Sequence, residues 1–223
     1  MDPRRAFFER LAEEWDAQQP PDREERLRWL LAPFREHLRD ARAVLEIGTG
    51  TGALIPIIRE IAPAALIVSV DLAYSMLWQA RRRCPNAWLA QADAHRPPFP
   101  AGAFDRVVCH NVFPHFRDKP AALAELARVL RPGGLLLILH DRSREEVNAI
   151  HRSVGSPIGN DLLPTGAELS LLLTQAGFRN AEVEDGLNNY WAIGSNDEDF
   201  FGRKAALSQV QNLTERTPLS KLS

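Results

Sequence analysis

The segment Val44-Leu45-Glu46-Ile47-Gly48-Thr49-Gly50-Thr51-Gly52 decides the fold of this chain. A short apolar run ends directly in glycines at every second position, and an apolar helical pattern follows over residues 53–61. Glycine permits a sharp backbone turn and leaves no Cβ in the path of a ligand. A turn of this kind after the first strand of a doubly wound sheet lies where nucleotide-like ligands bind. The segment therefore predicts a strand over residues 43–47, a ligand-binding loop and a helix.

Strand and helix patterns alternate on the carboxyl side of this loop. Apolar runs predict strands over residues 66–70, 87–91, 104–110 and 135–140, and helical patterns between them cover residues 75–83 and 120–130. Further helices are expected over 143–151 and 165–176, and a final hairpin over 178–185 and 189–194. Because each strand run is short and almost wholly apolar, we expect a parallel sheet that is covered on both faces, which is an α/β fold.

Two helical patterns precede the first strand, over residues 4–16 and about 22–39. They predict an N-terminal helical extension, residues 1–40, whose aromatic side chains either pack in the core or cover a binding pocket as a lid. These side chains are Phe7, Phe8, Trp15 and Trp29. Residues 41–195 are expected to form the ligand-binding domain, and residues 196–223 a polar C-terminal tail.

Composition narrows the class of protein. The formal net charge is −2, so no global field favours nucleic acid, and we expect no nucleic-acid partner. The two cysteines, Cys84 and Cys109, provide neither a disulfide scaffold nor a zinc pattern. No apolar run approaches the roughly 20 residues that span a bilayer, and the charged N-terminus does not resemble a signal peptide. We expect a cytoplasmic enzyme without membrane insertion, as a monomer or homodimer.

Acidic residues lie at or near the ends of the first three predicted strands. Glu46 precedes the glycine turn, where a carboxylate repels a pyrophosphate; it suits a cationic ligand or holds the loop by accepting backbone N–H groups. Asp71 follows Gly50 by 21 residues, and it either accepts the hydroxyls of a ribose or caps the next helix. Asp93 either holds an adenine amino group or caps a turn. The glycine spacing also differs from the dinucleotide fingerprint Gly-x-Gly-x-x-Gly.

Five motifs in this order resemble those of class I S-adenosylmethionine-dependent methyltransferases, in the branch of the ubiquinone and menaquinone C-methylases. The motifs are Glu46–Gly52, Asp71, Asp93-Ala94, Phe104–Val108 and Leu130–Gly134. The resemblance covers roughly residues 40–195. It implies a Rossmann-like three-layer sandwich in which helices cover both faces of a seven-stranded, mostly parallel sheet with an antiparallel last strand.

The resemblance also implies a cofactor and a reaction. The cofactor is S-adenosyl-L-methionine, the product is S-adenosyl-L-homocysteine, and the methyl group passes to a small-molecule acceptor by in-line displacement. By position, the glycine loop contacts the methionine part, Asp71 the ribose, and Asp93 with Ala94 the adenine. The residues assigned to the cofactor site are Glu46, Gly48, Thr49, Gly50, Gly52, Asp71, Leu72, Met76, Asp93, Ala94, His110 and Asn111.

Catalytic candidates come from the polar residues beyond the fourth and fifth predicted strands. Methyl transfer from a sulfonium needs a general base only when the acceptor must lose a proton during attack. The candidates are His110, His115, His140, Asp141 and His151. Taken alone, each histidine is more typical of a packing or surface residue and Asp141 of a loop cap, and the spacing of the histidines does not support a metal site. The acceptor atom stays open. A second alternative is a non-catalytic protein that binds adenosylmethionine or adenosylhomocysteine. Glu46 and the glycine spacing argue against a third alternative, an NAD(P)-dependent oxidoreductase.

Overall fold

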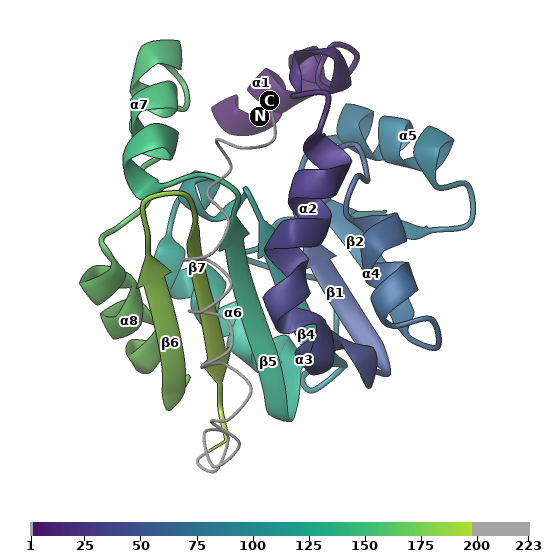
Figure 1. The fold of residues 1–223 in the computed structure, drawn as a ribbon, viewed down its shortest axis with the longest axis vertical. Coiled ribbons are helices and arrows are strands. Elements are labelled where there is room, and N and C mark those ends of the chain that lie inside the picture. Colours follow the sequence, from purple (N-terminus) through teal and green to yellow (C-terminus); the bar gives the residue numbers. More distant parts are fainter. Residues whose placement is uncertain (1, 198–223) are drawn as a thin grey trace.

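A computed structural model describes residues 2–197 of the chain, and its centre is one seven-stranded sheet with the strand order β3-β2-β1-β4-β5-β7-β6 (Figure 1). The strands are β1 (Ala43–Ile47), β2 (Leu66–Asp71), β3 (Trp88–Gln91), β4 (Phe104–His110), β5 (Leu130–His140), β6 (Asn180–Asp185) and β7 (Tyr190–Ser195). The first five strands pair in parallel, and β7 pairs antiparallel with both β5 and β6. The predicted α/β fold is confirmed, including its antiparallel last strand.

Helices lie on both faces of this sheet. They are α1 (Pro3–Leu11), α2 (Arg23–Leu31), α3 (Arg35–Arg39), α4 (Ile55–Ile61), α5 (Tyr74–Arg83), α6 (Lys119–Val129), α7 (Arg144–Val154) and α8 (Gly166–Gln175), with short 3₁₀ turns η1 (Asp16–Gln18), η2 (Ala32–Phe34) and η3 (Phe113–His115). The chain runs outward from β1 through α4 to β2, and in the opposite direction from β4 through α6 to β5. Since such crossovers are right-handed, α4 and α6 cover opposite faces.

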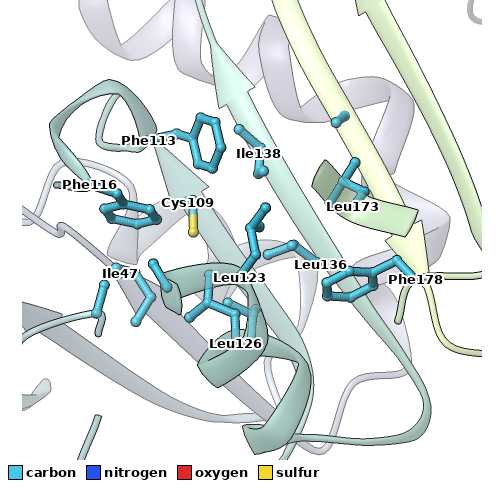
Figure 2. Packing of buried hydrophobic residues seen from close by; sticks show 14 of the residues in the cluster. Ile47, Cys109, Phe113, Phe116, Leu123, Leu126, Leu136, Ile138, Leu173 and Phe178 are labelled. Carbon is cyan, nitrogen blue, oxygen red and sulfur yellow. The ribbon is translucent and has the colours of Figure 1, made fainter. Parts of the chain in front are cut away.

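Successive side chains of the central strands point to opposite faces of the sheet and contribute to two separate hydrophobic cores. Val44 and Val108 point toward α2, α3 and α4, whereas Leu45 and Val107 point toward α6 and α8. Figure 2 shows the second cluster, in which Cys109 lies among side chains from β5, α6 and the segment after β4. Strands that are apolar on both faces are therefore buried on both faces, as their sequence predicts.

The N-terminal region divides into two parts with different packing. Apolar side chains of α2, η2 and α3 are fully buried against the sheet; they are Leu27, Leu30, Leu31, Phe34 and Leu38. By contrast, α1 has no buried residue and lies beyond the edge at which the parallel strands end (Figure 1). The single helix predicted over 22–39 is interrupted by η2, because Pro33 lacks an amide N–H and cannot continue the hydrogen-bond ladder.

Most other boundaries agree with the prediction to within three residues, but α1 ends at Leu11 instead of residue 16, and β5 begins five residues early. Strand β5 begins at Leu130, which pairs with Phe104, and regular pairing resumes at Leu135, where the strand was expected. Thr165 caps α8 in a reciprocal capping box with Glu168, as its position predicts. From residue 198 onward, the predicted C-terminal tail lies outside the described residues.

Candidate active site

A cavity opens at the carboxyl ends of β1, β2 and β4, with about 1050 Å³ of empty volume including its open mouth. Its walls include nearly all the residues predicted to hold the cofactor: Gly48, Thr49, Gly50, Asp71, Leu72, Met76, Asp93, Ala94, His110 and Asn111. Glu46 and Gly52 lie outside the lining. The structure thus brings together residues from four separate segments of the sequence.

The glycine loop uses its glycines for two purposes. Gly48, Gly50 and Gly52 all have positive φ, at 71°, 55° and 79°. A Cβ on Gly48 would lie 2.3 Å from Cγ2 of Val112, and one on Gly52 would lie 3.0 Å from Cβ of Ala80. A Cβ on Gly50 would meet nothing within 4 Å. Gly48 and Gly52 therefore permit close packing of the loop, whereas Gly50 keeps its backbone open on the cavity side.

Glu46 supports this loop from inside the protein. Its side chain is buried, and Oε2 accepts hydrogen bonds from the hydroxyls of Thr49 (2.9 Å) and Ser69 (2.7 Å). Burial raises the pKa of Glu46 to about 7, against the effect of these two hydrogen bonds. The carboxyl orders the loop through hydroxyl groups, and not through the backbone N–H groups considered from the sequence.

Asp71 connects the loop to the start of α5. Oδ2 accepts from the backbone N–H of Gly50 (2.8 Å), and Oδ1 accepts from that of Ala73 (2.9 Å). Burial raises the pKa of Asp71 to about 6, although these hydrogen bonds favour the carboxylate. Because each carboxylate oxygen accepts more than one hydrogen bond, the group retains capacity for ligand hydroxyls. The helix contact and the ligand contact considered from the sequence are thus compatible.

Asp93 and His95 form the wall beyond β3. Oδ1 of Asp93 accepts from the backbone N–H of His95 (2.9 Å) and from its Nδ1–H (2.5 Å). Nε2 of His95 accepts from the backbone N–H of Asp118 (3.1 Å), so both ring nitrogens are engaged. Sequence reasoning did not assign His95 to the site, although its position directly after Asp93-Ala94 is a signal for it.

The predicted catalytic residues fall into two groups. His110 and His115 line the cavity, whereas His140, Asp141 and His151 do not. Within the described part of the chain, Nε2 of His110 and Nε2 of His140 are buried without a hydrogen-bond partner. Burial lowers the pKa of His110 to about 4 and that of His140 to about 3, so both rings are neutral at pH 7.

Asp141, which does not line the cavity, forms a hydrogen bond with the residue that follows β4. Its Oδ1 accepts from Nδ2 of Asn111 (2.9 Å), a residue with the left-handed φ of 51°. Arg26 on α2 donates to the backbone carbonyl of Asp141 (3.0 Å). Non-glycine residues occupy this backbone region rarely, and they cluster at functional sites. Asp141 therefore contributes to the shape of the cavity wall at Asn111.

His115 belongs to a cluster of residues that are distant in sequence and that no sequence pattern brought together. Its Nδ1 donates to Oδ2 of Asp161 (2.9 Å), whose side chain is 1% exposed. Arg4 on α1 also donates to this carboxylate, with Nε at 3.0 and 2.8 Å from its two oxygens. The ring of His151 lies against that of His115, with centroids 4.8 Å apart and a tilt of 33°, and its Nδ1 donates to the backbone carbonyl of Asp161. Phe8 completes the contact from α1, 4.9 Å from the His115 ring.

Residues 2–23 form the outer wall of the cavity. The lining residues from this region are Asp2, Arg4, Phe8, Trp15, Gln19 and Arg23. Glu9 fixes α1 to α5, because its carboxylate accepts from the backbone N–H groups of Tyr74 (2.9 Å) and Ser75 (2.7 Å). Although burial raises the pKa of Glu9, these hydrogen bonds outweigh it and lower the pKa to about 2. Phe7 and Trp29, by contrast, do not line the cavity.

Asp16 ties the same region to the glycine loop. It accepts from the hydroxyl of Thr51 (2.6 Å) and forms ion pairs with Arg23 (2.7 Å) and Arg83 (2.5 Å).

In residues 2–197 no group of three or more His, Cys, Asp or Glu side chains is arranged to hold a metal ion. No helix of that range is long and apolar enough to cross a membrane.

Comparison with known proteins identifies the family. Residues 45–138 match the family described as "Methyltransferase domain". Malonyl-[acyl-carrier protein] O-methyltransferase of Geobacter sulfurreducens is 34% identical over 192 residues, which cover 81% of this chain and 72% of that protein. Demethylmenaquinone methyltransferase of Thermus thermophilus is 42% identical over 118 residues, 51% of this chain; the match spans 54% of that protein, about half of its length.

Solved structures agree on the fold. An S-adenosylmethionine-dependent methyltransferase from Thermotoga maritima superimposes with a TM-score of 0.66 at 21% identity, covering 85% of this chain and 98% of that one. The segment that matches the methyltransferase family, residues 45–138, includes the glycine loop, Asp71, Asp93 and the residues after β4. The chain thus belongs to the class I S-adenosylmethionine-dependent methyltransferases, in the branch that includes the ubiquinone and menaquinone C-methyltransferases.

Proposed function

We propose that this protein binds S-adenosylmethionine in the cavity at the carboxyl ends of the strands and transfers its methyl group to a small-molecule acceptor. The observation that carries the proposal is the convergence of the glycine loop, Asp71 and Asp93 on one cavity that also contains His110 and His115. The first three belong to the cofactor half. The two histidines, one at the end of β4 and the other in η3, belong to the acceptor half.

The residues present fit adenosylmethionine. Gly50 leaves space for the methionine part, because a Cβ there would meet nothing within 4 Å. Asp71 has acceptor capacity for the ribose hydroxyls, and Asp93 lies where an adenine amino group can donate to it. Leu72, Met76, Ala94 and Phe116 supply apolar walls for the adenine ring. Glu46 and Gly52 act on the loop from outside the cavity.

The bound sulfonium supplies an activated methyl group with a good leaving group. The protein then has to position the acceptor in line and exclude water, which accounts for much of the rate of such displacements. In this proposal residues 2–23 cover the cavity, with Phe8 and Trp15 facing it, and residues 41–195 carry the cofactor site. His110, Asn111 and His115 contact the acceptor, while His140, Asp141 and His151 support them from behind.

Two measurements test the proposal. Calorimetric titration should show one binding site for adenosylhomocysteine and none for NADH. Adenosylhomocysteine release should then depend on an added acceptor from a panel that contains a hydroquinone and a malonyl thioester, the acceptor chemistries suggested by the relatives' names. Absence of adenosylhomocysteine binding would contradict the cofactor assignment. Tight binding without turnover on any acceptor would indicate a non-catalytic binding protein.

A further inference from the structure

We propose that His115 is the general base of this site, that Asp161 positions it, and that Arg4 completes the group from the N-terminal helix. The inference rests on the proposed methyltransferase function and adds a substrate class to it. The acceptor is a compound that must lose a proton on methylation, such as an aromatic hydroxyl compound, and not a carboxylate that is already ionised.

The hydrogen bond to Asp161 fixes the tautomer of His115. Although burial opposes it, the hydrogen bonds from His115 and Arg4 hold the pKa of Asp161 below its ordinary value, so the group is a carboxylate at pH 7. An ionised carboxylate only accepts hydrogen bonds, and therefore Nδ1 of His115 carries the proton. The lone pair of the neutral ring is on Nε2, which makes no hydrogen bond to any described residue. The ring lines the cavity, and its Nε2 is not among the buried side-chain atoms without a partner, in contrast to Nε2 of His110; we therefore assign this nitrogen to the acceptor.

The other histidines lack this combination. Both ring nitrogens of His95 are engaged, by Asp93 and by the backbone of Asp118. His110 lines the cavity, but its Nε2 is buried, and no carboxylate accepts a hydrogen bond from its ring within the described residues. His140 and His151 are outside the lining. His115 alone among the described histidines joins a cavity position to a carboxylate on one ring nitrogen and an unengaged second nitrogen.

The charges around His115 suit a base that is neutral before reaction. Burial lowers the pKa of His115, and Asp161 opposes this effect. The groups that face the pair are Arg4 from α1, Lys119 from α6, His151 from α7 and His140 from β5. Burial, with a smaller contribution from Arg4, keeps the ring unprotonated near pH 7, while Asp161 still stabilises the imidazolium once it forms.

Methylation of such an acceptor moves one proton to His115 and one electron pair to the sulfur. The acceptor's X–H bond breaks, and its proton passes to Nε2 of His115. The acceptor atom that becomes the nucleophile forms a bond to the methyl carbon, whose bond to sulfur breaks with both electrons remaining on sulfur. The imidazolium, held by Asp161, then releases its proton to solvent. A carboxylate acceptor would need no such base. The rings of Phe8 and Phe116 beside His115 favour an aromatic hydroxyl.

Opposite charge changes provide the test. In adenosylhomocysteine-saturated protein with ¹⁵N-labelled histidine, NMR should show His115 protonated on Nδ1 and unprotonated on Nε2 at pH 7.5. Asp161→Asn should lower the titration midpoint of His115 by about one pH unit or more, because it removes the carboxylate. Arg4→Gln should raise the midpoint, because Asp161 is no longer neutralised. Arg10→Gln, an exposed change on the same helix, should leave it unchanged. A proton on Nε2, or shifts of equal sign for Asp161→Asn and Arg4→Gln, would overturn the inference.

Activity gives a second readout. With 1,4-naphthohydroquinone as the probe acceptor, His115→Gln should lower kcat by about 10²- to 10⁴-fold and abolish the acidic limb of its pH profile. The KM for adenosylmethionine should change little. An unchanged pH profile in a folded, adenosylhomocysteine-binding His115→Gln protein would contradict the role of His115 alone. Failure of the wild-type protein to bind adenosylhomocysteine would instead contradict the proposed function.

Discussion

Replacing Gly48 with alanine should destabilise the fold more than the same change at any other positive-φ glycine of the binding loop. Gly48 has a φ of 71°, a conformation that costs an alanine about 1–2 kcal/mol. The new Cβ would also lie 2.3 Å from Cγ2 and 2.5 Å from Cβ of Val112. Rotation about χ1 leaves Cβ of Val112 in place, so no rotamer of this valine removes the 2.5 Å contact.

The two costs add to a large effect. Overpacking of this kind costs about 1–3 kcal/mol. Together with the backbone term, Gly48→Ala should lower the free energy of unfolding by about 2–5 kcal/mol. Gly50→Ala and Gly177→Ala have the backbone term without the clash, since a Cβ at either position meets nothing within 4 Å. Each should therefore lose only about 1–2 kcal/mol.

Urea unfolding at pH 7, followed by circular dichroism, measures the three losses side by side. Gly177 lies after α8, away from the cavity, and serves as the matched control for backbone strain. Calorimetry with adenosylhomocysteine separates folding from binding: Gly50→Ala should weaken binding at least tenfold, whereas Gly177→Ala should not. If Gly48→Ala and Gly177→Ala lose equal stability, the contact with Val112 does not constrain the loop and the reasoning is refuted.

Three further predictions concern carboxylates. The pKa of Glu46 is raised to about 7, so its contribution to stability is present below pH 4.5 and is lost as pH rises through 7. Relative to Glu46→Gln, the wild-type protein should lose about 3 kcal/mol of unfolding free energy between pH 4.5 and 8. If the unfolding free energies of the two proteins depend on pH in the same way, this prediction is wrong. The pKa of Glu9 is lowered to about 2, so its contribution is present above pH 4.5 and lost on acidification through 2. Glu9→Gln should cost about 0.5–2 kcal/mol at pH 7 in urea unfolding, as loss of a helix cap does, while Glu13→Gln, which is exposed, should be neutral. Asp71→Asn should weaken adenosylhomocysteine binding by about 10- to 100-fold in calorimetry, since hydrogen bonds to charged groups contribute about 1.5–3 kcal/mol; exposed Asp22→Asn is the control, and equal affinities would remove Asp71 from the site.

The cofactor half of the cavity was predictable because local patterns encode it. Gly48 to Gly50, Asp71 and Asp93 each follow a strand that its apolar run reveals, and carboxyl ends of parallel strands meet at one edge. The helix end at Gly177 and the cap at Thr165 were predictable for the same local reason. What could not be predicted was which nearby residue each carboxylate contacts.

The acceptor half depends on contacts between distant segments. Arg4, His115 and Asp161 lie far apart in the sequence, and no periodicity or spacing relates them. The entropic cost of closing such long loops is offset by the fold as a whole and not by neighbouring residues, so these contacts leave no local signature. Glu9 is a similar case, because it caps a helix more than sixty residues away and replaces the side-chain cap that Ala73 cannot provide. The sequence likewise did not predict which histidines line the cavity and which lie in the interior.

A crystal structure with adenosylhomocysteine bound tests the central claim most directly. We predict that the ribose hydroxyls donate to Asp71, that the adenine lies beside Asp93 and Ala94, and that the homocysteine part follows Gly48 to Gly50. Space for the acceptor should then remain between the sulfur and Nε2 of His115. A ligand bound elsewhere, or a ribose out of hydrogen-bond reach of Asp71, would contradict the account.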